Sequence, residues 1–394
     1  MDTRKVQEEY ARKRRTDIEF AVRPSLAKRF AQWLERINKA VWLQVLRMLL
    51  RTKHVDHAID PNRIQSVLIL RYDAIGDMIV TTPFWRNLKR LNPQLRIGVA
   101  ASARNIDVIR ADDDVDVRFL FSEGALLQTI RGIREVRKQK WDVVLALVYK
   151  KKTKGAIIAR LCSPKGVTST AIKEEGLSRS KILFSHVTQF PNPVHPVPTN
   201  EFLRSHFEGI FGLNIAADAW HASLRIDPVV ESRTHDRIKK ILLADAAGGF
   251  VHINIESATP FREWGLANNL ALSKWIIESY PGLSVLWTSS PTQAVSTNAF
   301  LAANPNARLH HFETSDVHEL FTVVRNSTLV ISPDTSIIHI AGAELKPTVG
   351  LFVEQNEWLP SGVPNRVLFP EKGSPVSSIT LDSVKRAVSE LLDR

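Results

Sequence analysis

From about residue 62 onward, short apolar runs alternate with longer stretches of helical periodicity, and this alternation constrains the fold more than any other feature. The first series of runs is SVLILRY (66–72), RIGVAAS (96–102), VRFLF (117–121) and WDVVLALV (141–148). Each run has the length of a strand and is followed by a stretch compatible with a helix. Strands that alternate with helices form βαβ units, in which the strands are parallel. The pattern therefore predicts an α/β fold with a doubly wound parallel sheet.

A second series of the same kind begins near residue 248. Its runs are GFVHINI, LSVLWTS, ARLHHF, STLVISP and PTVGLFV, all between residues 249 and 353. A chain of 394 residues is also long enough for two ordinary domains. We therefore expect two Rossmann-like domains that face each other across a cleft. Their expected bounds are 59–228 and 229–375, followed by a closing helix over 376–394.

The first 58 residues lie outside this alternation and carry an uneven share of the charge. Residues 1–53 contain 14 Lys and Arg against 6 Asp and Glu, so they hold +8 of the net charge of +12. Between residues 24 and 53, apolar side chains recur at helical spacing with basic ones between them, which predicts a basic amphipathic helical extension. Such a helix either lies on an anionic membrane or packs on its own domain, and its periodicity is the same in both cases.

Composition excludes several other classes of protein. The single cysteine, Cys162, leaves no disulfide framework, and without a Cys/His cluster we expect no metal site. We find neither a signal peptide nor an apolar run long enough to span a bilayer, so we expect a cytoplasmic protein, soluble or peripheral on the inner face of the membrane. The positive charge comes without an aromatic platform or a recognition motif, so no nucleic-acid partner is expected.

The stretch LRYDAIGDMIV places Asp77 just after the first expected strand, where a helix begins. Ligands of open parallel sheets bind beyond the carboxyl ends of the strands, where helix N-termini present free N–H groups. Gly76 is expected to permit a tight turn there. Asp77 is then either a functional carboxylate at the mouth of the cleft or the N-cap of the helix. The stretch has one glycine and lacks the G-x-G-x-x-G of a dinucleotide site.

A second strand end lies in LVISPDTSIIHIAGAELKPTVGLF (329–352). Asp334 is expected to cap the following helix, whose first two turns carry Thr335, Ser336 and His339. Backbone N–H groups, hydroxyls and an imidazole at a helix N-terminus suit a pyrophosphate. A histidine in this place is also commonly structural.

Two further strand ends carry cations. The segment NIESATPFREW (254–264) contains Ser257 and Arg262, and an arginine there can neutralise a departing phosphate. The loop YKKKTKG (149–155) carries Lys150, Lys151 and Lys152, which form either an anion-binding surface or a solvated loop.

In their order, these segments resemble glycosyltransferase family 9, the lipopolysaccharide heptosyltransferases. The segments that carry the likeness are LRYDAIGDMIVTTP, SATPFREW, DTSIIHIAGA, KPTVGLFV and EWLPSG. The likeness covers roughly residues 62 to 392 and leaves out the first 55 or so. It implies a GT-B fold, an N-terminal acceptor domain and a C-terminal donor domain. The implied reaction is an inverting, metal-independent transfer of a sugar, without a cofactor, from a nucleotide sugar such as ADP-heptose to an anionic lipid-linked saccharide.

The resemblance also implies roles for single residues. Asp77 would be the general base that takes the proton of the acceptor hydroxyl. Arg71 would touch the acceptor, and we expect the loop with Lys150, Lys151 and Lys152 to bind the anionic acceptor as well. The implied donor-site residues are Ser257, Arg262, Asp334 and His339, together with the neighbouring Thr335 and Ser336, and Arg262 would lie near the pyrophosphate.

Three positions depart from the family pattern. Ser336 and Val353 each replace a glycine, and Gln293 takes the place of an acidic residue that often holds the donor ribose. These departures bear on the identity of the donor more than on sugar transfer itself. They leave a second hypothesis open, a non-catalytic scaffold of the same fold that binds a nucleotide or a saccharide.

Overall fold

The computed structural model describes residues 41–50, 52–121, 126–148, 152–173, 179–190, 198–242 and 249–393. Most of the extension predicted over residues 1–58 lies outside these ranges. Of the helix expected over 24–53, the described part is a helix over residues 41–49. None of the helices in the described ranges is long and apolar enough to cross a membrane.

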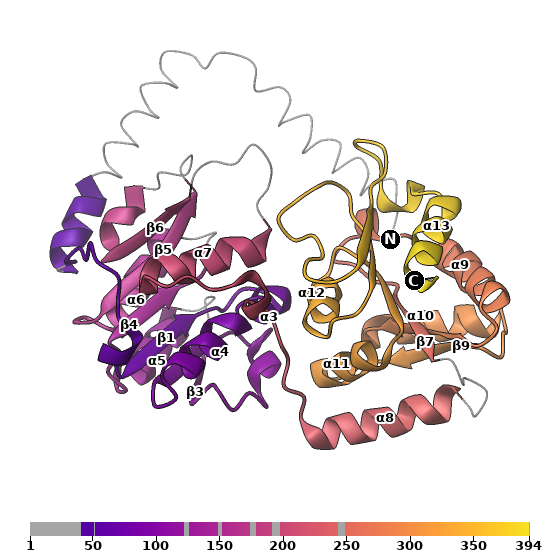
Figure 1. Ribbon diagram of the computed structural model, residues 1–394, viewed down its shortest axis with the longest axis horizontal. Coiled ribbons are helices and arrows are strands. Elements are labelled where there is room, and N and C mark those ends of the chain that lie inside the picture. The colour runs from indigo at the N-terminus through magenta and orange to yellow at the C-terminus, as the bar shows by residue number, and fades with distance from the viewer. Residues whose placement is uncertain are drawn as a thin grey trace, which may run out of the picture.

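The N-terminal domain is built on a six-stranded sheet whose strands all run parallel, in the order β3-β2-β1-β4-β5-β6 (Figure 1). The strands are β1 (Ser66–Leu70), β2 (Arg96–Ala101), β3 (Val117–Leu120), β4 (Val143–Ala146), β5 (Val167–Lys173) and β6 (His186–Phe190). The helices are α3 (Ile75–Ile79), α4 (Thr82–Leu91), α5 (Leu126–Arg137), α6 (Lys152–Cys162) and α7 (Thr199–Phe211).

Strand β1 lies at the centre of this sheet and is buried along its whole length. Its side chains alternate between two cores, because successive residues of a strand point to opposite faces. Val67 and Ile69 pack with residues of α4 and α7, whereas Leu68 and Leu70 pack with residues of α5 and α6. Burial on both faces explains why the strand is a continuous apolar run.

The C-terminal domain repeats the plan with a second parallel sheet, in the order β12-β11-β10-β7-β8-β9. Its strands are β7 (Phe250–Asn254), β8 (Ser284–Ser289), β9 (Leu309–Glu313), β10 (Leu329–Pro333), β11 (Thr348–Leu351) and β12 (Asn365–Leu368). Its helices are α8 (Pro228–Leu242), α9 (Leu266–Ser279), α10 (Pro291–Ala302), α11 (Val317–Asn326), α12 (Ser336–Ala343) and α13 (Leu381–Leu392). The predicted α/β class with two Rossmann-like domains is confirmed.

Each apolar run identified in the sequence contains a strand, but the pattern does not reveal β5, β6 or β12. Strand β5 reads VTSTAIK, and its buried residues Thr168, Ser169 and Thr170 are polar. Their hydroxyls are satisfied by local partners, as in the bond from Thr170 Oγ1 to the Ala146 carbonyl oxygen (3.0 Å). A buried polar strand of this kind carries no hydrophobic signal.

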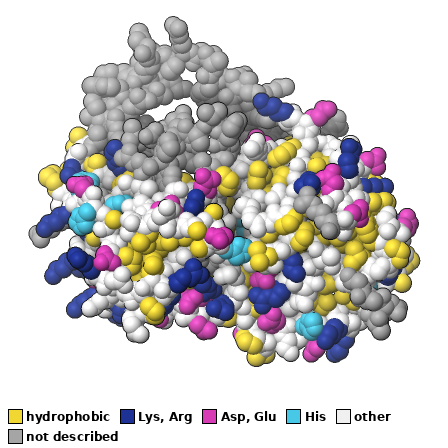
Figure 2. All heavy atoms as spheres, viewed as in Figure 1, with side chains coloured by type: hydrophobic (Ala, Val, Ile, Leu, Met, Phe, Trp, Pro, Cys, Tyr) yellow, Lys and Arg dark blue, Asp and Glu magenta, His cyan; other side chains and the backbone are white. Residues whose placement is uncertain are grey.

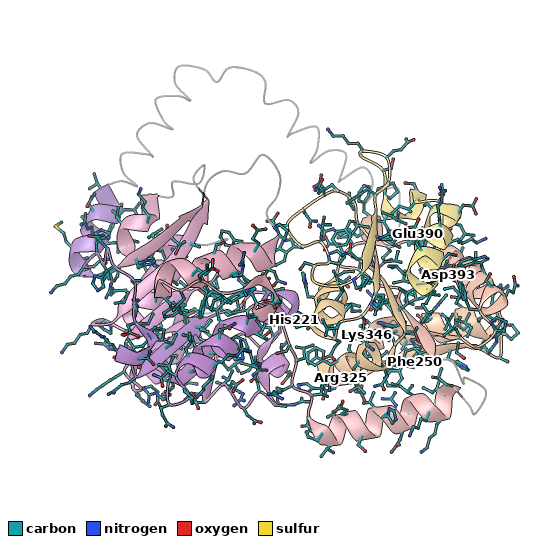
Figure 3. The ribbon with its side chains drawn as sticks, viewed as in Figure 1. His221, Phe250, Arg325, Lys346, Glu390 and Asp393 are labelled. Atoms are coloured by element: carbon teal, nitrogen blue, oxygen red, sulfur yellow. The ribbon has the colours of Figure 1, made fainter. Side chains whose placement is uncertain are left out.

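The two domains are in contact as well as facing each other. One apolar core continues from beneath the N-terminal sheet to Phe321, Ile337 and Ile340 of helices α11 and α12. Polar contacts reinforce it: Arg110 pairs with Asp316 (2.9 Å). Arg325 of α11 donates to the carbonyl of Leu224, in the linker before α8, and pairs with Glu231 of α8 and with Glu344. Figure 3 labels Arg325 on the C-terminal domain, above helix α8.

The acidic run 112–116 supports the fold of the N-terminal domain. Asp112 is 2% exposed and accepts bonds from Trp85 Nε1 (2.9 Å) and from both terminal nitrogens of Arg86 (2.6 and 2.9 Å). Asp114 also pairs with Arg86. Among the described residues, no group of His, Cys, Asp and Glu side chains is arranged to hold a metal ion.

We expect Asp112→Asn to destabilise the N-terminal domain strongly, because it removes the buried one of the two carboxylates that pair with the largely buried Arg86 and leaves only the partly exposed Asp114. Removing one partner of a buried ion pair costs about 3–5 kcal/mol. The matched control is Asp113→Asn, since Asp113 is exposed and a surface change typically costs within about 0.5 kcal/mol. Urea unfolding of both variants measures the difference, and equal midpoints would refute this role for Asp112.

Candidate functional site

A cleft of about 1500 Å³ lies between the domains. From the N-terminal domain, residues 73–77 of the turn after β1, Arg104 and Phe202 line it. From the C-terminal domain, the lining follows the carboxyl ends of β7, β8 and β10, at residues 256–258, 288–290 and 334–337. This is the edge at which open parallel sheets bind their ligands.

The floor of the cleft on the N-terminal side is organised by Arg71, which directly follows β1 and is fully buried. Its Nε donates to the Asp77 carbonyl (2.9 Å) and its Nη2 to Asp77 Oδ1 (2.8 Å). Its Nη1 donates to Asp73 Oδ2 (3.2 Å) and to the Leu147 carbonyl. The guanidinium thus fixes two carboxylates that both line the cleft.

Asp77 is not a helix cap, so that interpretation of its place in the sequence is wrong. The N-cap of α3 is Ala74, which makes no side-chain capping bond, and Asp77 lies within the helix. Its side chain is 18% exposed, paired with Arg71, and borders the cleft. The contact of Arg71 with an acceptor stays a prediction; what the structure gives Arg71 is a buried position behind Asp77.

Gly76 serves a purpose other than the tight turn expected from the sequence. Its φ is not positive, and it lies inside α3. A Cβ atom placed on it would lie 2.5 Å from Cδ2 of His339, on α12 of the opposite domain. The glycine is therefore required for the close approach of the two domains. Burial lowers the pKa of His339 to about 4, so its imidazole is neutral near pH 7.

The N-terminus of α12 faces the cleft with three predicted donor-site residues, Thr335, Ser336 and His339. The N-cap is Thr335, whose hydroxyl accepts from the Ile337 N–H, and the expected cap Asp334 is wrong. Asn254 Nδ2 donates to Thr335 Oγ1 (3.2 Å) and so ties this terminus to the end of β7.

Asp334 instead pairs with Arg262 across a 3.4 Å contact. Burial raises the pKa of Asp334, while the charge of Arg262 opposes that rise. Arg262 is 46% exposed and lines the cleft. Ser257 lies beside it, and its buried Oγ has no hydrogen-bond partner in the part of the chain that the structure describes. These residues bring one cation, Arg262, and one unsatisfied hydroxyl, that of Ser257, to the lining of the cleft.

Other predicted site residues lie elsewhere or outside the described ranges. Gln293 is exposed on the first turn of α10 and does not line the cleft. Lys150 and Lys151 are outside the described residues. Lys152 begins helix α6, so the expected lysine loop is helical from that residue on.

Sequence reasoning missed two carboxylates of the cleft, Asp73 and Glu256. Glu256 follows β7 and accepts from the backbone N–H (2.8 Å) and the hydroxyl (3.0 Å) of Ser290, which follows β8. Both carboxylates come directly after a strand, which was the available signal.

The chain matches the family model described as glycosyltransferase family 9 (heptosyltransferase) over residues 130–361. The chain belongs to this family. It is therefore a glycosyltransferase of the heptosyltransferase type. No curated protein sequence matches the chain significantly.

Solved structures show the same GT-B fold. A family 9 glycosyl transferase from Veillonella parvula matches with a TM-score of 0.69 and 16% identity, over 85% of this chain and 98% of that one. The E. coli ADP-heptose lps heptosyltransferase II matches with a TM-score of 0.64 and 17% identity, over 83% and 98%. E. coli heptosyltransferase WaaC with ADP matches with a TM-score of 0.64 and 14% identity, over the same shares.

We expect Gly76→Ala to destabilise this glycosyltransferase, although alanine is normally the better helix residue. The added methyl group meets the His339 ring, and overpacking of this kind costs about 1–3 kcal/mol. Thermal unfolding of the variant measures the effect. Gly155→Ala is the matched control, because the nearest atom to its added Cβ, the Val148 carbonyl oxygen, is 3.9 Å away.

A His339→Ala background removes the ring that the methyl group meets. In that background Gly76→Ala should cost little, whereas an unchanged cost would show that the interdomain contact is not the cause.

Proposed function

We propose that this family member is an inverting, metal-independent enzyme that moves a heptose or related sugar from a nucleotide diphosphate to an anionic, lipid-linked envelope saccharide such as lipopolysaccharide. One observation carries the proposal: Asp77, Arg262 and the N-terminus of α12 line the same cleft. The proposed base thus lies on the N-terminal side of the cleft and the proposed diphosphate-binding residues lie on its C-terminal side, with room for a sugar between them.

The acceptor side of the reaction rests on Asp77. Inversion requires a single in-line displacement at the anomeric carbon, with a base on the side of the attacking hydroxyl. Arg71 orients the carboxylate through Oδ1 and leaves the second oxygen to accept the proton of the acceptor. The carboxylate also favours a transition state that resembles an oxocarbenium ion.

The leaving-group side rests on α12 and Arg262. The positive end of the α12 dipole and the Ser336 hydroxyl are suited to a diphosphate, while the Thr335 hydroxyl caps the helix. Arg262 adds a positive charge, which Asp334 compensates in part across 3.4 Å, and this charge can stabilise the negative charge that develops on the leaving group. ADP-heptose is the donor probe of choice, because the E. coli relatives are described with ADP and as ADP-heptose enzymes.

We expect Asp77→Asn to lower the rate of sugar transfer by about 10²–10⁴, the usual contribution of a general base. Binding of the donor nucleotide should persist, because Asp77 lies opposite the anion-binding end. Transfer from ADP-, UDP- and GDP-sugars measures the first effect, and calorimetry with the nucleoside diphosphates measures the second. Asp113→Asn is the control carboxylate.

The outcomes separate the hypotheses. Near-wild-type transfer by Asp77→Asn would refute the assignment of the base. Absence of transfer by the wild-type chain together with absence of binding to every nucleotide would favour the non-catalytic scaffold.

We further propose that the protein docks on the anionic inner face of the membrane through the helix over residues 41–49. One side of this helix packs on the N-terminal domain through Leu43, with Leu46 and Leu50 beside it. Another side is apolar but exposed, with Trp42 at 59% and Leu49 at 71%. Figure 2 shows apolar side chains at the surface at the upper left of the view, where Figure 1 places this helix. The two interpretations of the sequence are thus compatible within one helix.

Charge supports a membrane as the partner. The first 53 residues hold +8 of the net charge, and basic residues near an anionic bilayer each contribute about 1 kcal/mol. Tryptophan favours the membrane interface because it is apolar with one polar end.

We expect Trp42→Ser combined with Leu49→Ser to weaken binding to anionic vesicles by roughly tenfold or more, from the lost burial of two large apolar side chains. Sedimentation of the full chain with phosphatidylglycerol vesicles measures this. Val229→Ser, at an equally exposed apolar residue of the C-terminal domain, is the control. Unchanged binding would exclude this face of the helix.

A further inference from the structure

Two carboxylates of the cleft share one buried guanidinium. Arg71 Nη2 donates to Asp77 Oδ1 (2.8 Å), and Arg71 Nη1 donates to Asp73 Oδ2 (3.2 Å). Arg71 carries one positive charge, so it cannot compensate both carboxylates when both are ionised. The proposed reaction uses Asp77 and assigns nothing to Asp73.

The surroundings of Asp73 differ from those of a structural carboxylate, whose oxygens are normally satisfied by hydrogen bonds. Its Oδ1 is buried and receives no side-chain hydrogen bond among the described residues, although the backbone N–H groups of Asp73 and Ala74 lie near the carboxylate. An uncompensated buried oxygen costs stability. The residue nevertheless lines the cleft beside Asp77. Strained polar groups of this kind concentrate at functional sites.

Few other charged groups act on this pair. Of the described residues, His339 on α12 faces Asp77 and Arg71, and Arg104 lines the same cleft. His339 is neutral near pH 7 and supplies no charge there. Lys150 and Lys151 lie outside the described residues. The nearest charges on each carboxylate are therefore Arg71 and the other carboxylate.

We infer that Asp73 is a positioning residue for the catalytic base: through the shared Arg71, the charge on Asp73 sets how strongly Asp77 attracts the proton of the acceptor. This inference rests on the proposed function of Asp77. While Asp73 is ionised, its negative charge makes Asp77 a stronger base. When Asp73 is protonated, Arg71 is left to Asp77 alone and weakens it.

The sign of the pH dependence follows from the surroundings of Asp73. Burial, opposed by Arg71 and reinforced by Asp77, raises the pKa of Asp73 to about 6. Asp73 is therefore ionised above pH 6 and becomes neutral as the pH falls through that value. Transfer should accordingly fall as the pH drops through about 6.

Direct titration tests the coupling without any substrate. The full chain is labelled with ¹³C at the aspartate carboxyls, and the spectra of D73N and D77N assign the two resonances. We expect Asp73 to titrate near pH 6 in the wild-type chain and at lower pH in D77N, where one cause of the raised pKa is removed. A midpoint in the ordinary range near 4, or one that D77N leaves unmoved, would overturn the inference. If D73N fails to fold, the wild-type chain and D77N still provide this result.

Kinetics with ADP-heptose as donor test the consequence. D73N should lose the inflection near pH 6 and transfer sugar up to about tenfold more slowly at high pH, the ratio that corresponds to one pK unit of lost coupling. D73E keeps a carboxylate and should restore an inflection. A structural role for Asp73 would lower the rate of D73N without moving the inflection, and that result would refute the inference.

The two proposals fail in distinguishable ways. Normal transfer by D77N would refute Asp77 as the base, and with it the inference. An inactive D77N together with an unaltered pH profile in D73N would refute the inference alone.

Discussion

The buried guanidinium of Arg71 is the interaction on which the proposed chemistry depends. Arg71 directly follows the central strand of the N-terminal sheet and holds the start of helix α3 through the backbone and side chain of Asp77. A charge in this position costs desolvation energy, which is recovered only while its acidic partners remain. The same side chain therefore shapes the cleft floor and opposes the rise that burial causes in the pKa of Asp73.

A second constraint is the contact between the domains. An apolar core crosses from one domain to the other. Because Gly76 has no side chain, His339 of the C-terminal domain can lie against helix α3 of the N-terminal domain. Helix α3, which carries the proposed base Asp77, and helix α12, which is proposed to bind the diphosphate, are thereby packed against each other. Placement of reacting groups in this way is a large part of what an enzyme contributes to rate.

Local sequence pattern predicted most of the fold, because apolar strands buried on both faces are visible as runs. It failed at β5, whose buried residues are hydroxyls, and it could not assign Asp334 and Thr335 to their roles at α12. The site was predictable where residues follow strands, as Asp77 and Arg262 do. It was not predictable where function depends on contacts between distant segments. The approach of His339 to Gly76 and the position of Gln293 outside the cleft depend on the tertiary structure and leave no signal in the sequence.

Under the proposed function, the contact between Gly76 and His339 affects how readily water can hydrolyse the donor. Gly76 adjoins Asp77, so any separation of the domains that frees the imidazole also moves the diphosphate helix away from the base. A sugar nucleotide held in a parted molecule would then be out of range of activation. Under the proposed function, the packing of His339 on Gly76 therefore also limits hydrolysis of the donor by water.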